Sequence, residues 1–105
     1  MKDSKLGVVE DTLYVPMLGR IYASENCKHI LYDKKSLELK NRMPEGLIEH
    51  DTQTQYTYLA SASRSANVDR YIEDFIERKS QGIIVQLGCG LETTYYRNDN
   101  GRTLW

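Results

Sequence analysis

The sequence has few of the residues that mark several large classes of protein. Its two cysteines, Cys27 and Cys89, stand alone rather than in a C-x-x-C pair, and neither of its two histidines lies at ligand spacing. This usage predicts reduced thiols, no metal site and a cytoplasmic protein. No apolar run approaches the roughly 18 residues of a membrane span. No apolar signal core follows the first residues, so we expect neither membrane binding nor secretion.

An excess of charge of one sign is also lacking. The 14 basic and 15 acidic residues give a net charge of −1, whereas nucleic-acid binders carry a basic excess. We therefore expect no nucleic-acid partner. The 105 residues allow one domain with a modest core. Eight of the ten aromatic residues are tyrosines, which favours amphipathic surfaces such as a ligand pocket or an interface.

Two short helices are predicted in the first half of the chain. From about residue 9 to residue 24, apolar side chains recur every three or four positions. Pro16 either kinks this helix or stands in the first turn of a new one. Asp33 is a good N-cap for a second helix over residues 34–42. A stop is predicted at residues 43–46, and the stretch that follows is ambiguous.

A long helix is predicted from about Thr54 to Lys79. Its solvated face includes Asp69. Its apolar stripe, which we expect in the core, is formed by Val68, Tyr71, Ile72, Phe75 and Ile76.

The stretch from Ile83 to Leu87 is apolar and rich in β-branched residues, as in a fully buried strand of a parallel sheet. Gly88 and Gly90 follow it and allow a tight turn in which the backbone can approach a ligand. A short helical turn is expected over residues 92–97, and a second strand begins at residues 103–105.

The Gly88-x-Gly90 spacing alone leaves the role of this turn open. A dinucleotide fingerprint needs a third glycine where Thr93 stands, so a nicotinamide or flavin cofactor is disfavoured. A tight strand-to-helix turn without any ligand fits the spacing equally well.

The wider pattern is more specific. The run from Val85 to Arg97, VQLGCGLETTYYR, resembles the first motif of the leucine carboxyl methyltransferase family, V-x-L-G-[AC]-G-[LM]-D-T-x-x-[YFW]-R. That family includes the tetracenomycin-type polyketide O-methyltransferases. Residues 11–20, DTLYVPMLGR, look like its opening T-L-x-x-P-x-x-[GA]-[RK] helix. Asp33 and Arg64 also match family segments, in the same order along the chain.

This resemblance implies a class I S-adenosylmethionine-dependent methyltransferase with a Rossmann-like α/β fold. The backbone of Gly88, Cys89 and Gly90 would line the methionine and ribose portion of the cofactor. Arg64 would pair with the cofactor's carboxylate, for which a guanidinium fork is well shaped. Arg97 would have a structural or site-shaping role, and no catalytic residue is assigned. Glu92 stands where the family usually has aspartate.

Within a single domain, 1–105, we expect a helical region over 9–80 and the first strand, glycine turn and start of the methyltransferase core over 82–105. The family's ribose-binding acid, adenine pocket and acceptor-binding segment would follow the last residue. The chain would then be the truncated N-terminal portion of an enzyme that methylates a carboxyl or hydroxyl oxygen of a small molecule or peptide, inactive alone. The alternative is a non-catalytic helical module for oligomerisation or interaction. Either a homo-oligomer or a complementing chain would cover the 83–87 strand.

Overall fold

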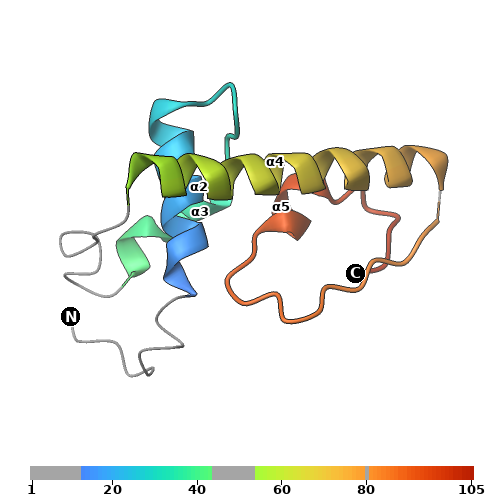
Figure 1. Ribbon diagram of the computed structural model, residues 1–105. Helices are drawn as coiled ribbons and strands as arrows, with labels where there is room; N and C mark the ends of the chain where they lie inside the picture. Colours follow the sequence, from blue (N-terminus) through green and yellow to red (C-terminus); the bar gives the residue numbers. More distant parts are fainter. Residues whose placement is uncertain (1–12, 44–53, 80) are drawn as a thin grey trace.

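The computed structural model describes residues 13–43, 54–79 and 81–105. Along these ranges the elements are α2 (Tyr14–Asn26), α3 (Lys34–Leu39), the 3₁₀ turn η1 (Lys40–Arg42), α4 (Gln55–Arg78) and α5 (Thr94–Asn98). Figure 1 shows α4 as the longest element, with the last segment of the chain running beneath it. The predicted mostly helical chain is confirmed. None of these helices is long and apolar enough to cross a membrane.

The first described helix resolves the alternatives that Pro16 left open. Helix α2 begins at Tyr14, so Pro16 lies in its first turn, where a missing N–H costs no helical hydrogen bond. The predicted start near residue 9 lies outside the described residues. The helix continues two residues beyond the predicted end at Ser24, to Asn26.

The second predicted helix is confirmed as α3 followed by η1. The Asp33 side chain accepts a hydrogen bond from the backbone N–H of Ser36 and so caps α3 as predicted. The expected stop at 43–46 and the ambiguous stretch after it fall almost entirely on residues 44–53, outside the described part of the chain.

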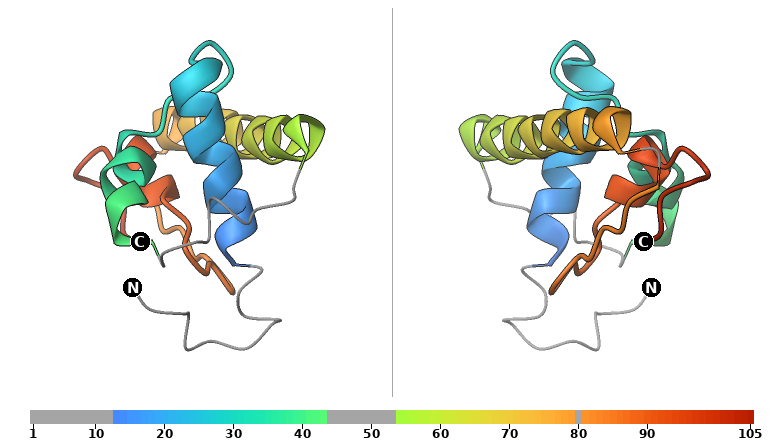
Figure 2. Two further views of the ribbon diagram at one scale, coloured as in Figure 1. Left: turned by 90° about the vertical axis from the view of Figure 1, so that its left-hand side faces the viewer. Right: turned by 90° about the vertical axis from the view of Figure 1, so that its right-hand side faces the viewer.

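The core lies where α2 crosses α4 (Figure 2). Gly19 sits at the crossing, where a Cβ would lie only 2.9 Å from both Ser61 Cβ and the carbonyl oxygen of Tyr58. The absence of a side chain therefore lets the two helices approach closely. Fully buried Ala23 and Ala62 extend this contact, and the other buried apolar side chains are Met17, Leu18, Ile21 and Leu31.

Helix α4 matches the predicted long helix, with Thr54 as its N-cap. Its expected core stripe is wrong. Val68 is 45% and Tyr71 78% exposed, and Ile72, Phe75 and Ile76 are only half-buried. The physical reason is that α2 covers the N-terminal half of α4. Farther along, α4 meets the short helix α5, which contacts it at Asp69, and a thin extended segment (Figure 1).

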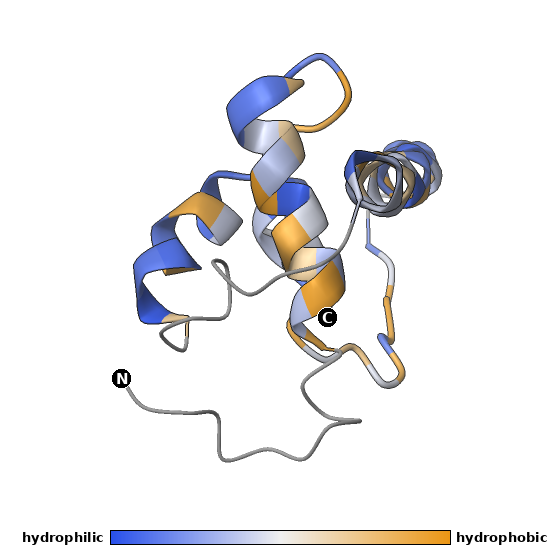
Figure 3. Cartoon of the chain, turned by 60° about the vertical axis from the view of Figure 1, so that its left-hand side comes forward, coloured by the Kyte–Doolittle hydropathy of each residue, from blue (hydrophilic) through white to orange (hydrophobic). Residues whose placement is uncertain are grey.

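The expected buried strand is also corrected. Within the described ranges the only β pairing is an isolated parallel bridge between Ile83 and Leu104. Val85 is 72% and Leu87 89% exposed, because no neighbouring strand lies along them. Figure 3 shows the apolar residues of this stretch in orange, in an extended segment that leaves α4. A Rossmann-like sheet therefore remains a prediction. The short helical turn expected over residues 92–97 is present as α5.

Candidate functional site

The glycine turn leaves the 83–87 segment and leads into α5. Gly88 and Gly90 have φ angles of 56° and 57°, in the left-handed region that favours glycine. A Cβ at Gly88 would meet nothing within 4 Å, whereas one at Gly90 would lie 3.0 Å from Leu13 Cδ2. The backbone of Gly88 is thus open to a ligand, and Gly90 is packed against the start of α2. Cys89, between them, is an exposed free thiol.

Arg20, on α2, anchors the end of this turn. Its Nη2 donates a hydrogen bond to the carbonyl oxygen of Leu91 at 2.7 Å, and its Nε donates to Asp33 Oδ2 at 3.1 Å. The side chain is only 2% exposed. Burial lowers the pKa of the guanidinium below its ordinary value, while the nearby carboxylates of Glu92 and Asp33 oppose that shift. The link spans 71 residues and ties the turn to the helical region.

Asp33 is the centre of the buried contacts. Besides Arg20, its carboxylate accepts hydrogen bonds from the Ser36 hydroxyl at 2.6 Å, from Arg97 Nη1 at 2.9 Å and from the Thr93 hydroxyl. Burial would raise the pKa of Asp33. The hydrogen bonds from Ser36 and Thr93 and the charge of Arg97 outweigh it, so the pKa lies below its usual range. The carboxylate therefore stays ionised although it is fully buried.

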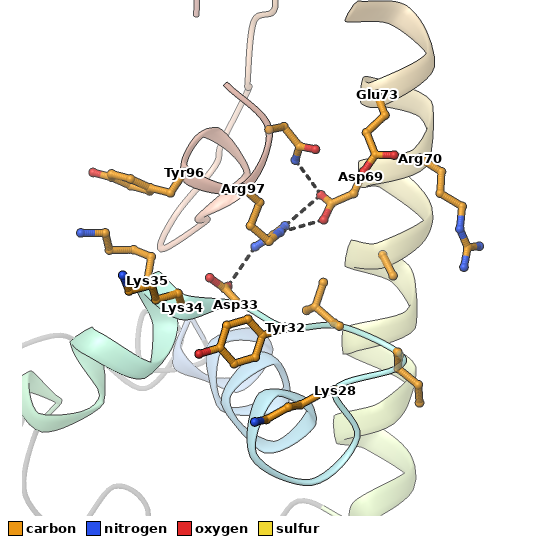
Figure 4. Close-up of a pocket in the computed structure, with 14 residues that line it drawn as sticks. Lys28, Tyr32, Asp33, Lys34, Lys35, Asp69, Arg70, Glu73, Tyr96 and Arg97 are labelled. Carbon is orange, nitrogen blue, oxygen red and sulfur yellow. Dashed lines mark hydrogen bonds and ion pairs between the residues drawn. The ribbon is translucent and has the colours of Figure 1, made fainter. Parts of the chain in front are cut away.

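Arg97, on α5, forms a two-bond fork with Asp69 of α4. The Nε–Oδ2 distance is 2.8 Å and the Nη2–Oδ1 distance is 3.1 Å. Asn98 Nδ2 adds a 3.0 Å bond to the same carboxylate (Figure 4). Burial would lower the pKa of Arg97, but the hydrogen bonds and charge of Asp69 raise it above its ordinary value. Arg97 thus ties α5 to α4 and to Asp33.

Glu92 completes this arrangement at the end of the glycine turn. Its carboxylate lies 3.7 Å from Arg20 Nη1 and 3.5 Å from Arg97 Nη2, and it accepts the backbone N–H of Thr93 at 3.0 Å. Burial would raise the pKa of Glu92, but the charge of Arg20 and the Thr93 N–H lower it overall. We call the five residues the ion-pair cluster: Arg20, Asp33, Asp69, Glu92 and Arg97.

None of the five cluster residues was among the predicted cofactor-binding residues, and Asp69 and Arg20 were given no role of their own at the site. Asp69 was assigned to a solvated helix face, but it is only 8% exposed. The signal was present in the spacing, because Asp69 shares a helix face with buried Ala62 and half-buried Ala66. For Arg20, the only indication of a role was the family resemblance, because Arg20 is the basic residue that ends the opening motif.

The predicted cofactor residues are only partly brought together. Gly88, Cys89 and Gly90 form one exposed turn. Arg64 lies on an exposed part of α4, and no hydrogen bond or ion pair within the described residues joins it to that turn. Among the residues described, no group of three or more histidine, cysteine or acidic side chains is arranged to hold a metal ion.

Comparisons with protein-family models, with curated proteins and with solved structures found no match to this chain.

Proposed function

We propose that the chain contributes the S-adenosylmethionine-binding turn of an O-methyltransferase, as its motif resemblance implies. The observation that carries this proposal is the conformation of the glycine turn. Both Gly88 and Gly90 have positive φ angles, and the backbone of Gly88 is open. A side chain at either position would strain the turn or obstruct a ligand that approaches the backbone.

The ion-pair cluster supports the proposed binding turn because its contacts fix the end of the turn. Arg20 binds the carbonyl oxygen of Leu91, and Asp33 binds the hydroxyl of Thr93. A turn fixed in this way needs little reordering when a ligand binds, which lowers the entropic cost of binding.

S-adenosylmethionine would supply the methyl group. The acceptor oxygen, from a carboxyl or hydroxyl group, attacks the methyl carbon while the carbon–sulfur bond breaks and its electron pair stays on sulfur. Positioning of donor and acceptor does most of the work in such a transfer. Backbone atoms of residues 88–90 would orient the methionine and ribose portion, and Arg64 would pair with the carboxylate.

The test is calorimetric titration of the purified chain with S-adenosylhomocysteine. Micromolar binding is expected in the parent chain, and the Arg64→Ala and Gly88→Val variants should lose it. Arg78→Ala is the matched control, because Arg78 is an exposed arginine on the same helix whose ion pair, with Asp74, is also exposed. The absence of binding at millimolar ligand, or equal losses in Arg64→Ala and the control, contradicts the proposal.

A second candidate function, self-association, is favoured by a different observation. Ile84 N–H and the carbonyl oxygen of Gly82 pair with Leu104, so the backbone groups of Ile83 and Val85 point to the opposite, open edge. A groove of about 310 Å³ lies beside this edge, lined by Val68, Tyr71, Ile72, Phe75, Ile83 and Ile84.

The partner that fits this edge is the same strand of a second copy. An antiparallel two-fold pairing with Val85 opposite itself sets Ile83 opposite Leu87 and uses the open backbone groups on both sides. The stretch from 82 to 88 carries no charge and no proline, the devices by which edge strands of monomers avoid such pairing. Light scattering that gives a monomer mass at high protein concentration contradicts this second function.

A further inference from the structure

A cleft of about 470 Å³ opens between α4, α5 and the connection from α2 to α3. Its floor includes Asp33, Asp69 and Arg97 of the ion-pair cluster (Figure 4). The glycine turn does not line it, so the cleft is separate from the proposed cofactor site.

The lining of this cleft is positive, although the whole chain has a net charge of −1. Two of its three carboxylates, Asp33 and Asp69, are already bound to arginine in the ion-pair cluster. The third is Glu73. Against these three carboxylates stand five cations: Lys28, Lys34, Lys35, Arg70 and Arg97.

The three lysines of the cleft make one ion pair among the residues that the structure describes. Lys34 and Lys35 occupy the first turn of α3, the end of a helix that favours acidic side chains. Lys35 has one exposed partner, Glu38 at 3.2 Å. Lys28 and Lys34 form no ion pair with any residue that the structure describes. An anion bound in the cleft would be attracted to these ammonium groups.

Two tyrosines hold lysine ammonium groups at the cleft. Lys35 Nζ lies 4.7 Å from the ring centre of Tyr96, and Lys28 Nζ lies 5.5 Å from that of Tyr32. Tyr96 and Tyr32 remain 61% and 50% exposed as whole residues. In Figure 4 the ends of Lys28, Tyr32 and Lys35 point to the same side of the view. The cleft therefore combines positive charge with open aromatic surface.

We infer that this cleft binds a phosphomonoester whose organic part is a planar aromatic ring. A phosphomonoester is mostly a dianion near neutral pH and offers three acceptor oxygens. Lysine binds phosphate as a point charge, which suits three ammonium groups on flexible stems. The exposed faces of Tyr32 and Tyr96 can pack against the ring in an offset or edge-on arrangement. This ligand site goes beyond the proposed methyl transfer and does not depend on it.

The experiment is an NMR titration of the full ¹⁵N-labelled chain with phenyl phosphate at low salt and about pH 7.5, where the ligand is dianionic. Amide shifts are expected at residues 28–35 and 95–98. Phenyl phosphate should bind more tightly than inorganic phosphate, which lacks the ring, and than benzoate, which carries one charge. Added salt should weaken the binding because the ammonium groups are exposed.

The double variant Lys28→Gln/Lys34→Gln should weaken binding by about tenfold, since each exposed charge contributes modestly. Lys79→Gln is the matched control, because Lys79 is exposed but lies outside the cleft, and it should bind like the parent chain. Circular dichroism checks that the variants are folded. If a variant does not fold, the amide shifts of the unaltered chain still show where phenyl phosphate binds.

Three results overturn the inference: shifts confined to residues 88–93, unchanged affinity in the double variant, or an equal loss in the control. Phenyl phosphate and S-adenosylhomocysteine are expected to shift different amides. A failure of phenyl phosphate to bind therefore leaves the methyltransferase proposal intact, and a failure of S-adenosylhomocysteine to bind leaves the phosphomonoester site intact.

Discussion

The ion-pair cluster and the 83–87 segment invert the usual distribution of side chains. Arg20 and Asp33 are 2% and 0% exposed, whereas Val85 and Leu87 are 72% and 89% exposed. Charges are buried where every carboxylate finds several donors, and apolar side chains are exposed where no strand or helix lies over them. The comparison teaches that polar contacts fix the glycine turn, while the extended segment before it has apolar surface left to bury.

The largest expected effect comes from breaking the cluster. Arg97→Ala should lower the free energy of unfolding by about 3–5 kcal/mol, because it leaves buried Asp69 without its guanidinium partner and buried Asp33 with Arg20 alone. Urea unfolding followed by circular dichroism measures this loss.

Arg78→Ala is the control for that loss. Its ion pair with Asp74 is exposed and spaced i,i+4 on α4, so its removal should cost no more than about 0.5 kcal/mol. Similar losses in the two variants would mean that burial of the cluster contributes nothing. The milder Asp69→Asn variant provides the same comparison if Arg97→Ala no longer folds.

An intermediate effect is expected from acid. The pKa values of Asp33 and Glu92 are lowered in the folded chain relative to the unfolded chain. Their stabilisation is therefore present above the unfolded pKa values, about 3.9 and 4.3, and is lost as the pH falls through the lower folded values. The free energy of unfolding should be constant between about pH 7 and pH 5 and fall steadily below pH 4.

The matched variant for this pH series is Glu92→Gln, which removes one titrating group and should reduce the slope. Stability that does not change between about pH 5 and pH 3 is incompatible with ionised, stabilised carboxylates at these two positions.

The smallest effect on stability is expected in the 83–87 segment. Val85→Lys should change the free energy of unfolding by less than about 0.5 kcal/mol, since the side chain is already exposed. It should abolish self-association, because the two-fold pairing sets the two lysines directly opposite each other. Size-exclusion chromatography with light scattering measures the mass.

Tyr56→Lys is the control for Val85→Lys, because Tyr56 is 81% exposed at the other end of α4. If both variants, or neither, lose the larger species, the edge at residues 83–87 is not the contact.

The features that depend on residues adjacent in the sequence were predicted correctly. The bounds of α4, the Asp33 cap of α3 and the turn into α5 follow from periodicity and capping, which are local. The burial of Ile83 to Leu87 could not be predicted in the same way, because it depends on which element covers the strand rather than on its composition.

The contacts of the ion-pair cluster could not be predicted from the local sequence either. Asp69 and Arg97 are 28 residues apart, and Arg20 and Leu91 are 71 apart. Nothing in the local pattern around Arg20 indicates that its guanidinium is buried. The motif resemblance includes Arg20 and Arg97, but it does not indicate that they lie close together or that Asp69 joins them.

Amide hydrogen exchange on the unaltered chain at low micromolar concentration tests most directly the claim that polar contacts, rather than the strand, fix the turn. The N–H groups of Glu92 and Tyr96, bonded to the carbonyl oxygens of Cys89 and Thr93, should exchange as slowly as the centre of α4. The N–H groups of Ile83 and Val85 should exchange rapidly. Slow exchange along the strand together with fast exchange at residues 92–96 would contradict the account.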